Sequence, residues 1–208
     1  MMALEYQVSQ GRPHDAKAAA ALLYDSDPPY YDFWLGSQDL ALTILAALWQ
    51  QSAGAYSAVN IQVVHDSVGL AALFSAYPAA FENSLAQHSE VALKAVHTDA
   101  LAMLQRESQL AYLFPRIPDD AWYLRTLAVA AERRGAGLGA QLLRHVEQQA
   151  RDQGYSLLLT DVDSGNPRAV RFYQRAGFEI LVETKVTRLL AHRLPASLRM
   201  AKYLNQDS

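Results

Sequence analysis

The sequence predicts a mixed α/β domain whose first half is strongly helical. Two features of its patterning support this fold class. Short apolar or alternating runs recur along the chain, as in β-strands, and stretches with an apolar residue every three or four positions lie between several of them. At 208 residues the chain suits one domain with a sizeable buried core.

The predicted elements follow one another without an internal repeat. Strands are predicted at Glu5–Val8, Val59–His65, Gly69–Ala76, Tyr123–Val129, Ser156–Val162, Phe178–Thr187 and Leu198–Leu204. Helices are predicted at His14–Tyr24, Asp39–Gln50, Ala79–Gln87, Val91–Glu107, Leu138–Gln153 and Pro167–Ala176. Local signals bound the last two helices, because Gly154 and Gly177 suit helix ends and Asn166 before Pro167 suits a helix start.

The segment DSDPPYYDFWLG, Asp25–Gly36, is the one compositional oddity of the chain. Pro28 and Pro29 predict an extended loop, and aromatic residues follow them closely. Two interpretations stay open: the rings fill a gap in the core, or they form a wall or lid over a substrate site. In the second case the ring faces, that of Trp34 among them, would suit an apolar or cationic substrate.

Composition and charge exclude several classes of function. The formal net charge of −3 argues against nucleic acid as the main partner. Because the chain has no cysteine, it has no disulfide, no thiolate metal site and no cysteine nucleophile. The histidines show no ligand spacing, so no metal site is expected. The first residues do not resemble a secretory signal and no apolar run suits a membrane span, so we expect a cytoplasmic protein without a membrane partner.

Three glycines stand directly before an otherwise ordinary amphipathic helix, in the stretch RRGAGLGAQLLRHVEQQA that begins at Arg133. Glycine in a first helical turn is costly, so Gly135, Gly137 and Gly139 need a backbone reason or a ligand reason. They follow a predicted strand, and the N–H groups of the helix start have no partner within the helix. Successive free amides, the helix dipole and the two arginines before them predict a pyrophosphate-binding turn.

Two other interpretations of this stretch stay open. The glycines can serve a tight turn for conformational reasons alone. They also satisfy a loose dinucleotide fingerprint, GxGxxA over Gly135–Ala140, with Asp161 at about the offset of a ribose-binding acid. The chain after the loop, however, leaves little room for the later strands of a doubly wound dinucleotide domain.

Residues Arg134–Gly139, RGAGLG, resemble the R/Q-x-x-G-x-G/A acetyl-coenzyme A (acetyl-CoA) motif of the GNAT (Gcn5-related N-acetyltransferase) family. Asn166–Tyr173, NPRAVRFY, and Ala176–Phe178, AGF, resemble the second motif of that family in its usual order and distance. The resemblance covers about residues 123–204. It implies a GNAT-like mixed, mostly antiparallel central sheet flanked by helices, with an extended helical N-terminal half.

The resemblance also implies a set of site residues. The acetyl-CoA-binding positions are Leu127, Val129, Arg134, Gly135, Ala136, Gly137, Leu138, Gly139 and Asn166. The amides of the glycine stretch would hold the pyrophosphate, and the strand that carries Leu127 would pair with the pantetheine arm and polarise the thioester carbonyl. Tyr173 matches the tyrosine that acts as general acid near the coenzyme sulfur, although a tyrosine on this short helix also suits packing.

The activity implied is transfer of an acetyl group to a primary amine, on a small molecule or a protein, by direct transfer in a ternary complex. Without a cysteine or a GxSxG motif, no covalent acyl-enzyme is expected. The strand Tyr123–Val129 carries Arg125 and no carboxylate, where some family members place a glutamate, so the general base stays open. Candidate substitutes are Asp161, Asp163, Glu82 and His65.

The implied domain organisation is a single acyltransferase domain over residues 1–208. Within it, about 123–204 would form the acetyl-CoA-binding core, and the helix-rich part at about 10–120 would shape the acceptor site. Two other functions stay open. One is a non-catalytic module that binds or senses acyl-CoA on the same fold, and the more remote one is a dinucleotide-binding oxidoreductase.

Overall fold

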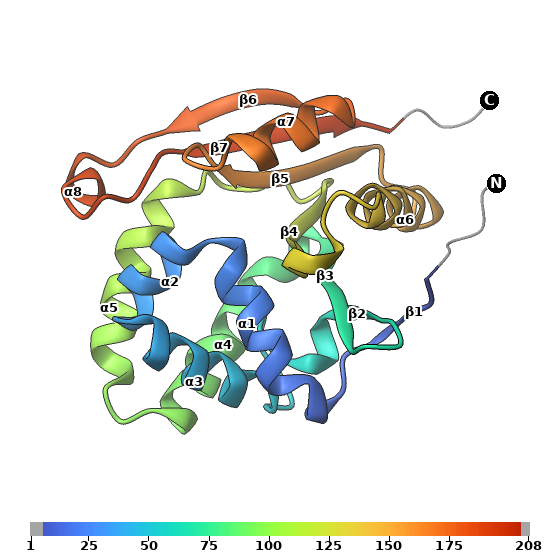
Figure 1. Cartoon of the computed structure of the whole chain (residues 1–208). Helices are drawn as coiled ribbons and strands as arrows, with labels where there is room; N and C mark the ends of the chain where they lie inside the picture. The colour runs from blue at the N-terminus through green and yellow to red at the C-terminus, as the bar shows by residue number, and fades with distance from the viewer. Residues whose placement is uncertain (1–5, 205–208) are drawn as a thin grey trace.

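The central sheet has the strand order β1-β2-β3-β4-β5-β7-β6 in the computed structural model, which describes residues 6–204 (Figure 1). The strands are β1 (Val8–Gln10), β2 (Gln62–His65), β3 (Leu70–Pro78), β4 (Trp122–Val129), β5 (Leu157–Asp163), β6 (Glu179–Thr184) and β7 (Ser197–Tyr203). Neighbouring strands are antiparallel except β4 and β5, which run parallel. The predicted fold class is therefore confirmed. Residues 6–204 do not form the doubly wound parallel sheet that a dinucleotide-binding domain requires.

Helices cover both faces of this sheet. They are α1 (Ala16–Ser26), α2 (Pro28–Leu35), α3 (Gln38–Trp49), α4 (Glu82–Val96), α5 (Ala100–Leu110), α6 (Leu138–Asp152), α7 (Pro167–Arg175) and α8 (Thr187–Leu190). Figure 1 shows α1 to α5, coloured blue to green, gathered in one group, with α6 and α7 apart from it. Among the described residues, no helix is both long and apolar enough to cross a bilayer.

The sheet separates two hydrophobic cores, because successive side chains of a strand point to opposite faces. On β3, Leu73 belongs to the core that includes α1 to α5, whereas its neighbour Phe74 belongs to the core that includes α6. Val63 and Val64 of β2 divide in the same way. The helical first half therefore covers one face, and the helices that follow β4 and β5 cover the other.

Helix α6 buries the apolar stripe that its sequence predicts. Leu138, Leu142, Val146 and Ala150 are each 1% exposed or less, in the same core as Phe74. Burial of each large side chain contributes about 2 kcal/mol. This packing fixes the first turn of α6, and the glycine turn before it, beside the end of β4.

The prediction of a loop over Asp25–Gly36 is wrong, because most of this segment is helix α2. Asp27 caps the helix by accepting a hydrogen bond from the Tyr30 amide at 3.2 Å, and the two prolines occupy the first turn, where a missing N–H costs nothing. The interpretation that the rings fill the core is confirmed for Trp34, and the interpretation as a wall of a substrate site stays a prediction. Trp34 is only 1% exposed in the core, whereas Tyr30 lines the large cleft described below.

Other boundaries also differ from the prediction. The break between the helices predicted at Ala79–Gln87 and Val91–Glu107 falls instead at residues 97–99, and Val91 is 67% exposed within α4. The strand predicted to begin at Val59 begins at Gln62, because residues 58–60 form a short 3₁₀ helix. The strand predicted to reach Thr187 stops at Thr184. The first strand is Val8–Gln10, and Glu5, the start of the predicted strand, lies outside the described residues.

Candidate active site

The two parallel strands at the centre of the sheet pair over only part of their length. β4 and β5 are in register from Trp122 opposite Leu158 to Leu124 opposite Thr160. Beyond this point β4 continues to pair with β3, and β5 continues to pair with β7. The sheet is therefore open between the second halves of β4 and β5, and a cleft of about 1430 Å³ is lined by both strand ends.

The open edge of β4 presents backbone groups to this cleft. The Ala130 amide donates to the Ala71 carbonyl at 2.9 Å, which places residue 130 in a hydrogen-bonded pair with β3. Because hydrogen-bonded and non-hydrogen-bonded pairs alternate along an antiparallel ladder, the N–H groups of Leu127 and Val129 point away from β3. The two residues predicted to meet the pantetheine arm thus turn their amides toward the opening.

The glycine turn presents a second set of backbone donors. Helix α6 begins after Gly137, whose position carries no capping side chain, and its first intrahelical bond runs from the Gln141 amide to the Gly137 carbonyl at 3.1 Å. The amides of Leu138, Gly139 and Ala140 therefore have no partner within the helix. These donors and the positive end of the helix dipole face a region that lines the cleft, which is the arrangement of an anion site.

The three glycines have different roles. Gly135 and Gly137 have φ values of +86° and +85°, a conformation that side chains disfavour, so the backbone requires glycine at both positions. Gly139 has no such conformation, and a Cβ there would lie 3.6 Å from Phe172, an ordinary contact. The conformational interpretation thus explains two of the glycines, and it coexists with a turn that is open on its ligand side.

Both arginines before the turn have carboxylate partners. Arg134 donates through Nε to the Val129 carbonyl at 2.9 Å and through Nη2 to Asp25 at 2.5 Å. Arg133 pairs with Asp66. Both guanidinium groups are therefore already neutralised, whereas the sequence suggested two arginines free to bind a pyrophosphate. The main-chain amides are then the principal hydrogen-bond donors of the turn.

Helix α7 carries the two remaining predicted residues, and both line the cleft. Asn166 caps α7 because its side-chain oxygen accepts a hydrogen bond from the Ala169 backbone N–H at 3.0 Å. Its side-chain nitrogen takes no part in this cap. Tyr173 packs edge-on against Phe172 and Phe178. Burial raises the pKa of Tyr173 to about 12, so its hydroxyl keeps its proton at neutral pH.

Arg125 lies where β4 bulges, because Ser75 pairs with Thr126 and the next residue of β3 pairs with Leu124. Its guanidinium contacts Glu82 at 2.5 Å and donates to the Tyr56 hydroxyl at 3.3 Å. The second carboxylate oxygen of Glu82 accepts from the Tyr77 hydroxyl at 2.5 Å. Glu82, a candidate base, is therefore held by a cation.

The other candidate bases differ in their surroundings. Asp161 forms a buried ion pair with Arg199 at 2.6 Å, so this carboxylate, like Glu82, is paired with a cation. Asp163 lines the cleft. Asp27, which no local pattern marks as a site residue, lines the same cleft. Burial raises its pKa to about 7, and the neighbouring Asp163 adds to the rise. Only the capping role of Asp27 could be inferred locally, since its proximity to β5 depends on the fold.

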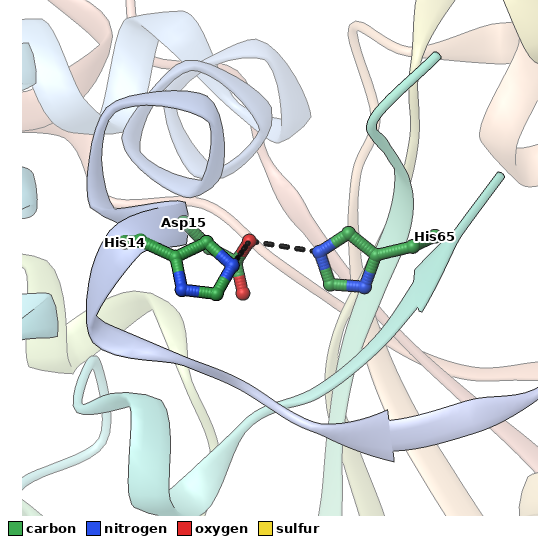
Figure 2. A group of neighbouring side chains, drawn as sticks. All are labelled: His14, Asp15 and His65. Carbon is green, nitrogen blue, oxygen red and sulfur yellow. Dashed lines mark hydrogen bonds and ion pairs between the residues drawn. The ribbon is translucent and has the colours of Figure 1, made fainter. Parts of the chain in front are cut away.

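His65 lies outside the cleft, in a cluster with His14 and Asp15 (Figure 2). Asp15 Oδ1 is 2.8 Å from His65 Nε2 and 3.6 Å from His14 Nε2, and the other carboxylate oxygen accepts from the Arg12 amide at 3.0 Å. The three ligand atoms lie within 4.8 Å of one another, so this cluster has the donor set of a divalent-cation site. The histidines are far apart in the sequence, which is why their spacing did not reveal it.

The fold and the cleft together fit a protein that binds an elongated, phosphate-bearing ligand along an opened sheet. A family model supports a more specific assignment. The model of the acetyltransferase (GNAT) family matches residues 70–178, which is more than half of the chain. The chain belongs to the acetyltransferase (GNAT) family, a family of acyltransferase enzymes.

Two curated relatives match short stretches of the chain. L-methionine sulfoximine/L-methionine sulfone acetyltransferase of Pseudomonas paraeruginosa is 40% identical over 52 residues, which cover 25% of this chain and 30% of that protein. N-acetyltransferase 8B of Homo sapiens is 38% identical over 65 residues, which cover 31% of this chain and 29% of that protein. The chain thus matches less than a third of the length of either relative.

Solved structures resemble the whole fold at low identity. An N-acetyltransferase from Staphylococcus aureus Mu50 aligns with a TM-score of 0.70 and 18% identity, over 94% of this chain and 100% of that one. A second solved acetyltransferase aligns with a TM-score of 0.66 and 20% identity, over 96% of this chain and 100% of that one. At these identities the likeness shows the fold.

Proposed function

We propose that this protein is an N-acetyltransferase that moves the acetyl group of acetyl-CoA to a primary amine by direct transfer, with both substrates bound together. One observation carries the proposal. A single cleft is lined by the amide-rich start of α6, by the unpaired half of β4 and by Tyr173. An elongated thioester with a diphosphate group matches these features, whereas a nicotinamide dinucleotide would require a different sheet.

Each binding role follows from a group that the cleft offers. The amides from Gly135 to Gly139, with Arg134 beside them, would hold the diphosphate. The amides of Leu127 and Val129 that point away from β3 would form hydrogen bonds with the pantetheine arm, as an added strand would. The side-chain nitrogen of Asn166 would contact the pantetheine arm or the groups next to it. In these assignments most of the hydrogen bonds to the coenzyme come from main-chain amides. This is consistent with the structure, in which Arg133 and Arg134 already pair with carboxylates.

Bound acetyl-CoA supplies the activated acetyl group, and the protein supplies the electrostatics of transfer. A backbone amide of β4, from Leu127 or Val129, is suited to donate to the thioester oxygen as negative charge develops there, a contribution of about 3 kcal/mol to the barrier. Tyr173, which stays protonated, is suited to donate its proton to the leaving sulfur. No cysteine is present, so the acetyl group passes directly to the amine.

The helix-rich part of the chain, at about residues 10–120, shapes the acceptor end of the cleft in this proposal. Tyr30, Tyr56 and Glu107 line that end from three different segments of the first half. Residues 123–204 supply the acetyl-CoA end. Because one relative acetylates L-methionine sulfone, free amino acids of this type belong in the first set of acceptors to test, beside larger peptide amines.

The test combines cofactor binding with turnover. Acetyl-CoA should raise the melting temperature, and NAD should not, because only a ligand that binds the folded state stabilises it. Thiol release should then exceed background hydrolysis with at least one amine from a panel of L-methionine sulfone, tyramine, putrescine and a tripeptide. Tight coenzyme binding without release for any amine would favour the sensing module. Stabilisation by NAD alone would overturn the proposal.

A further inference from the structure

Acetyl transfer to an amine requires a group that removes a proton from the incoming ammonium, and most carboxylates of the cleft are unsuited to this task. Asp161 is held by Arg199, and Glu82 is held by Arg125. Both oxygens of Asp161 accept hydrogen bonds from Arg199, although burial raises the pKa of this carboxyl group. The two oxygens of Glu82 accept from Arg125 and Tyr77, so in both carboxylates the oxygens are already bonded. The base must therefore be a carboxylate without a cation.

Asp27, Asp163 and Glu107 meet this condition within residues 6–204, but the charge of Arg125 opposes the rise that burial gives to the pKa of Glu107. This leaves Asp27 and Asp163. Asp27 stands at the corner between α1 and α2, and Asp163 ends β5, so two distant segments bring them to the same part of the cleft. Asp27 accepts only the long cap bond from the Tyr30 amide, and Asp163 accepts from the Gly165 amide at 2.6 Å. None of the ion pairs formed within residues 6–204 includes either carboxylate.

A small cavity behind the two carboxylates supplies a second, independent observation. Its volume is about 40 Å³, and Asp27, Asp163 and Ser197 all line it. Ser197 is 5% exposed, and its hydroxyl has no hydrogen-bond partner in the described part of the chain. Ser197 is also the β7 residue in register with Asp163. A cavity of this size admits water, which would satisfy the hydroxyl and connect the carboxylates to one another.

We infer that Asp27 is the general base that takes the proton of the acceptor amine, and that Asp163 is a positioning residue that keeps Asp27 ready to accept it. The inference rests on the proposed acetyltransferase function and adds the group that the sequence left open. Two carboxylates without a cation attract an ammonium group, and a base without a paired guanidinium can hold the proton it removes.

The proton balance of the step is complete. Asp27 takes one proton from the ammonium group, and the neutral nitrogen forms its bond to the acetyl carbon as the carbon–sulfur bond breaks. The sulfur receives the Tyr173 proton and leaves as the thiol. The nitrogen then gives up its second proton, which restores Tyr173, and Asp27 releases its own proton to solvent through the cleft that it lines. The net reaction consumes an ammonium and a thioester and yields an amide, a thiol and one proton.

The charged groups around Asp27 favour this role. Asp163 faces it from β5, and burial raises the pKa of both carboxyl groups, that of Asp27 to about 7. Tyr31, from its own helix, is neutral because burial raises its pKa well above the ordinary range. Two residues earlier, Asp25 is neutralised by Arg134. Within residues 6–204 no cation pairs with Asp27, so removing Asp163 should make Asp27 a weaker base.

The pH dependence of kcat/KM for the most active amine of the panel distinguishes this base from simple capture of free amine. With Asp27 as base, the profile rises to about pH 7 and then stays level. Without a base, kcat/KM keeps rising about tenfold per pH unit toward an amine pKa of about 10.4. Asp27→Asn should lower kcat/KM at pH 7 by about 100-fold or more and convert the level profile into the rising one.

Asn keeps the cap of α2, so Asp27→Asn should bind acetyl-CoA and fold as the wild type does. Asp163→Asn should move the rise of the profile to lower pH, an effect that a purely structural role would not produce. A pH titration of Asp163→Asn followed by carboxyl ¹³C NMR, without substrates, should show a lower pKa for Asp27 than in the wild type. Asp119→Asn removes another carboxylate that lines the cleft, one that pairs with Arg116, and serves as the matched control.

The outcomes separate the two proposals. If the wild type binds acetyl-CoA but acetylates no amine, the proposed function fails and the base with it. If the wild type is active and Asp27→Asn keeps its rate and level profile, only the assignment of the base is overturned. An equal loss in Asp119→Asn would also overturn it, since the effect would then belong to the charge of the cleft as a whole.

Discussion

Asp161 of β5 and Arg199 of β7 stand opposite each other in the sheet and form a buried two-point ion pair, with Oδ1 to Nε at 2.6 Å and Oδ2 to Nη2 at 2.8 Å. Each side chain is 4% exposed. The Tyr123 hydroxyl donates to the same carboxylate at 3.0 Å, and Arg199 also donates to the Pro115 carbonyl at 2.8 Å. This network ties β4, β5 and β7 together at the point where the sheet opens.

We expect Arg199→Met to lower the free energy of unfolding by about 3–5 kcal/mol, because it leaves the Asp161 charge buried without its partner. Urea denaturation at pH 7 measures the change. Arg188→Met removes an exposed arginine of α8 and should change stability by no more than about 0.5 kcal/mol. A comparably small loss in Arg199→Met would mean that Asp161 is not held in the way described.

The two types of glycine in the turn before α6 should respond differently to alanine. Gly137→Ala forces a side chain into a left-handed conformation, which costs about 1–2 kcal/mol and disturbs the amides that follow. Gly139→Ala enters ordinary contact distance and favours the helix, so stability should hold or rise. Calorimetric titration with coenzyme A should show about a tenfold weaker affinity for Gly137→Ala, a change of about 1.4 kcal/mol.

Gly139→Ala is the matched control in this comparison, and its coenzyme affinity should stay within about threefold of the wild type, a difference below about 0.7 kcal/mol. Equal losses in both variants would mean that space at the turn, and not backbone conformation, governs binding. No loss in either would place the coenzyme elsewhere.

Tyr173→Phe should lower kcat by about tenfold or more while leaving the affinity for acetyl-CoA unchanged. The phenyl ring keeps the contacts with Phe172 and Phe178, so the fold should be preserved. The variant loses the hydroxyl with its proton and its hydrogen bond to Thr160. Steady-state thiol release and calorimetry on the same preparation check both parts. Wild-type turnover with normal affinity would exclude Tyr173 as the acid.

The features that the sequence predicted well depend on neighbouring residues. The stripe from Leu138 to Ala150, the cap at Asn166 and the strand-to-helix glycine turn are all local patterns, and the structure places each as expected. The boundary errors have local causes too. Asp27 before two prolines is a helix start, and its signal was outweighed by the preference of prolines for extended chain.

The features that could not be predicted depend on residues far apart in the chain. The residues next to Asp161 in the sequence do not indicate that Arg199 will form an ion pair with it. Likewise, the residues next to Asp27 do not indicate that Asp163 will lie close to it. The sequence allows Trp34 a place in a substrate wall, but tertiary packing buries it in the core. Periodicity identifies which face of an element is buried, but it does not identify the partner across the fold.

The burial of Asp27 also predicts how stability depends on pH. Its pKa in the folded protein is about 7, against an ordinary value of 3.8, so the folded state binds this proton more tightly than the unfolded chain does. The Asp27 contribution to stability is therefore fully present below about pH 4 and is lost as pH rises through about 7. Asp27→Asn keeps the cap and cannot ionise, so it should match the wild type at about pH 4 and be the more stable protein at pH 8. Thermal unfolding of the two proteins across this pH range measures the difference. An equal offset at all pH values would show that this carboxyl group is not responsible. A gap that opens between about pH 4 and 7 and stays constant above pH 7 would show that the protein carries an unfavourable charge at the residue assigned as base.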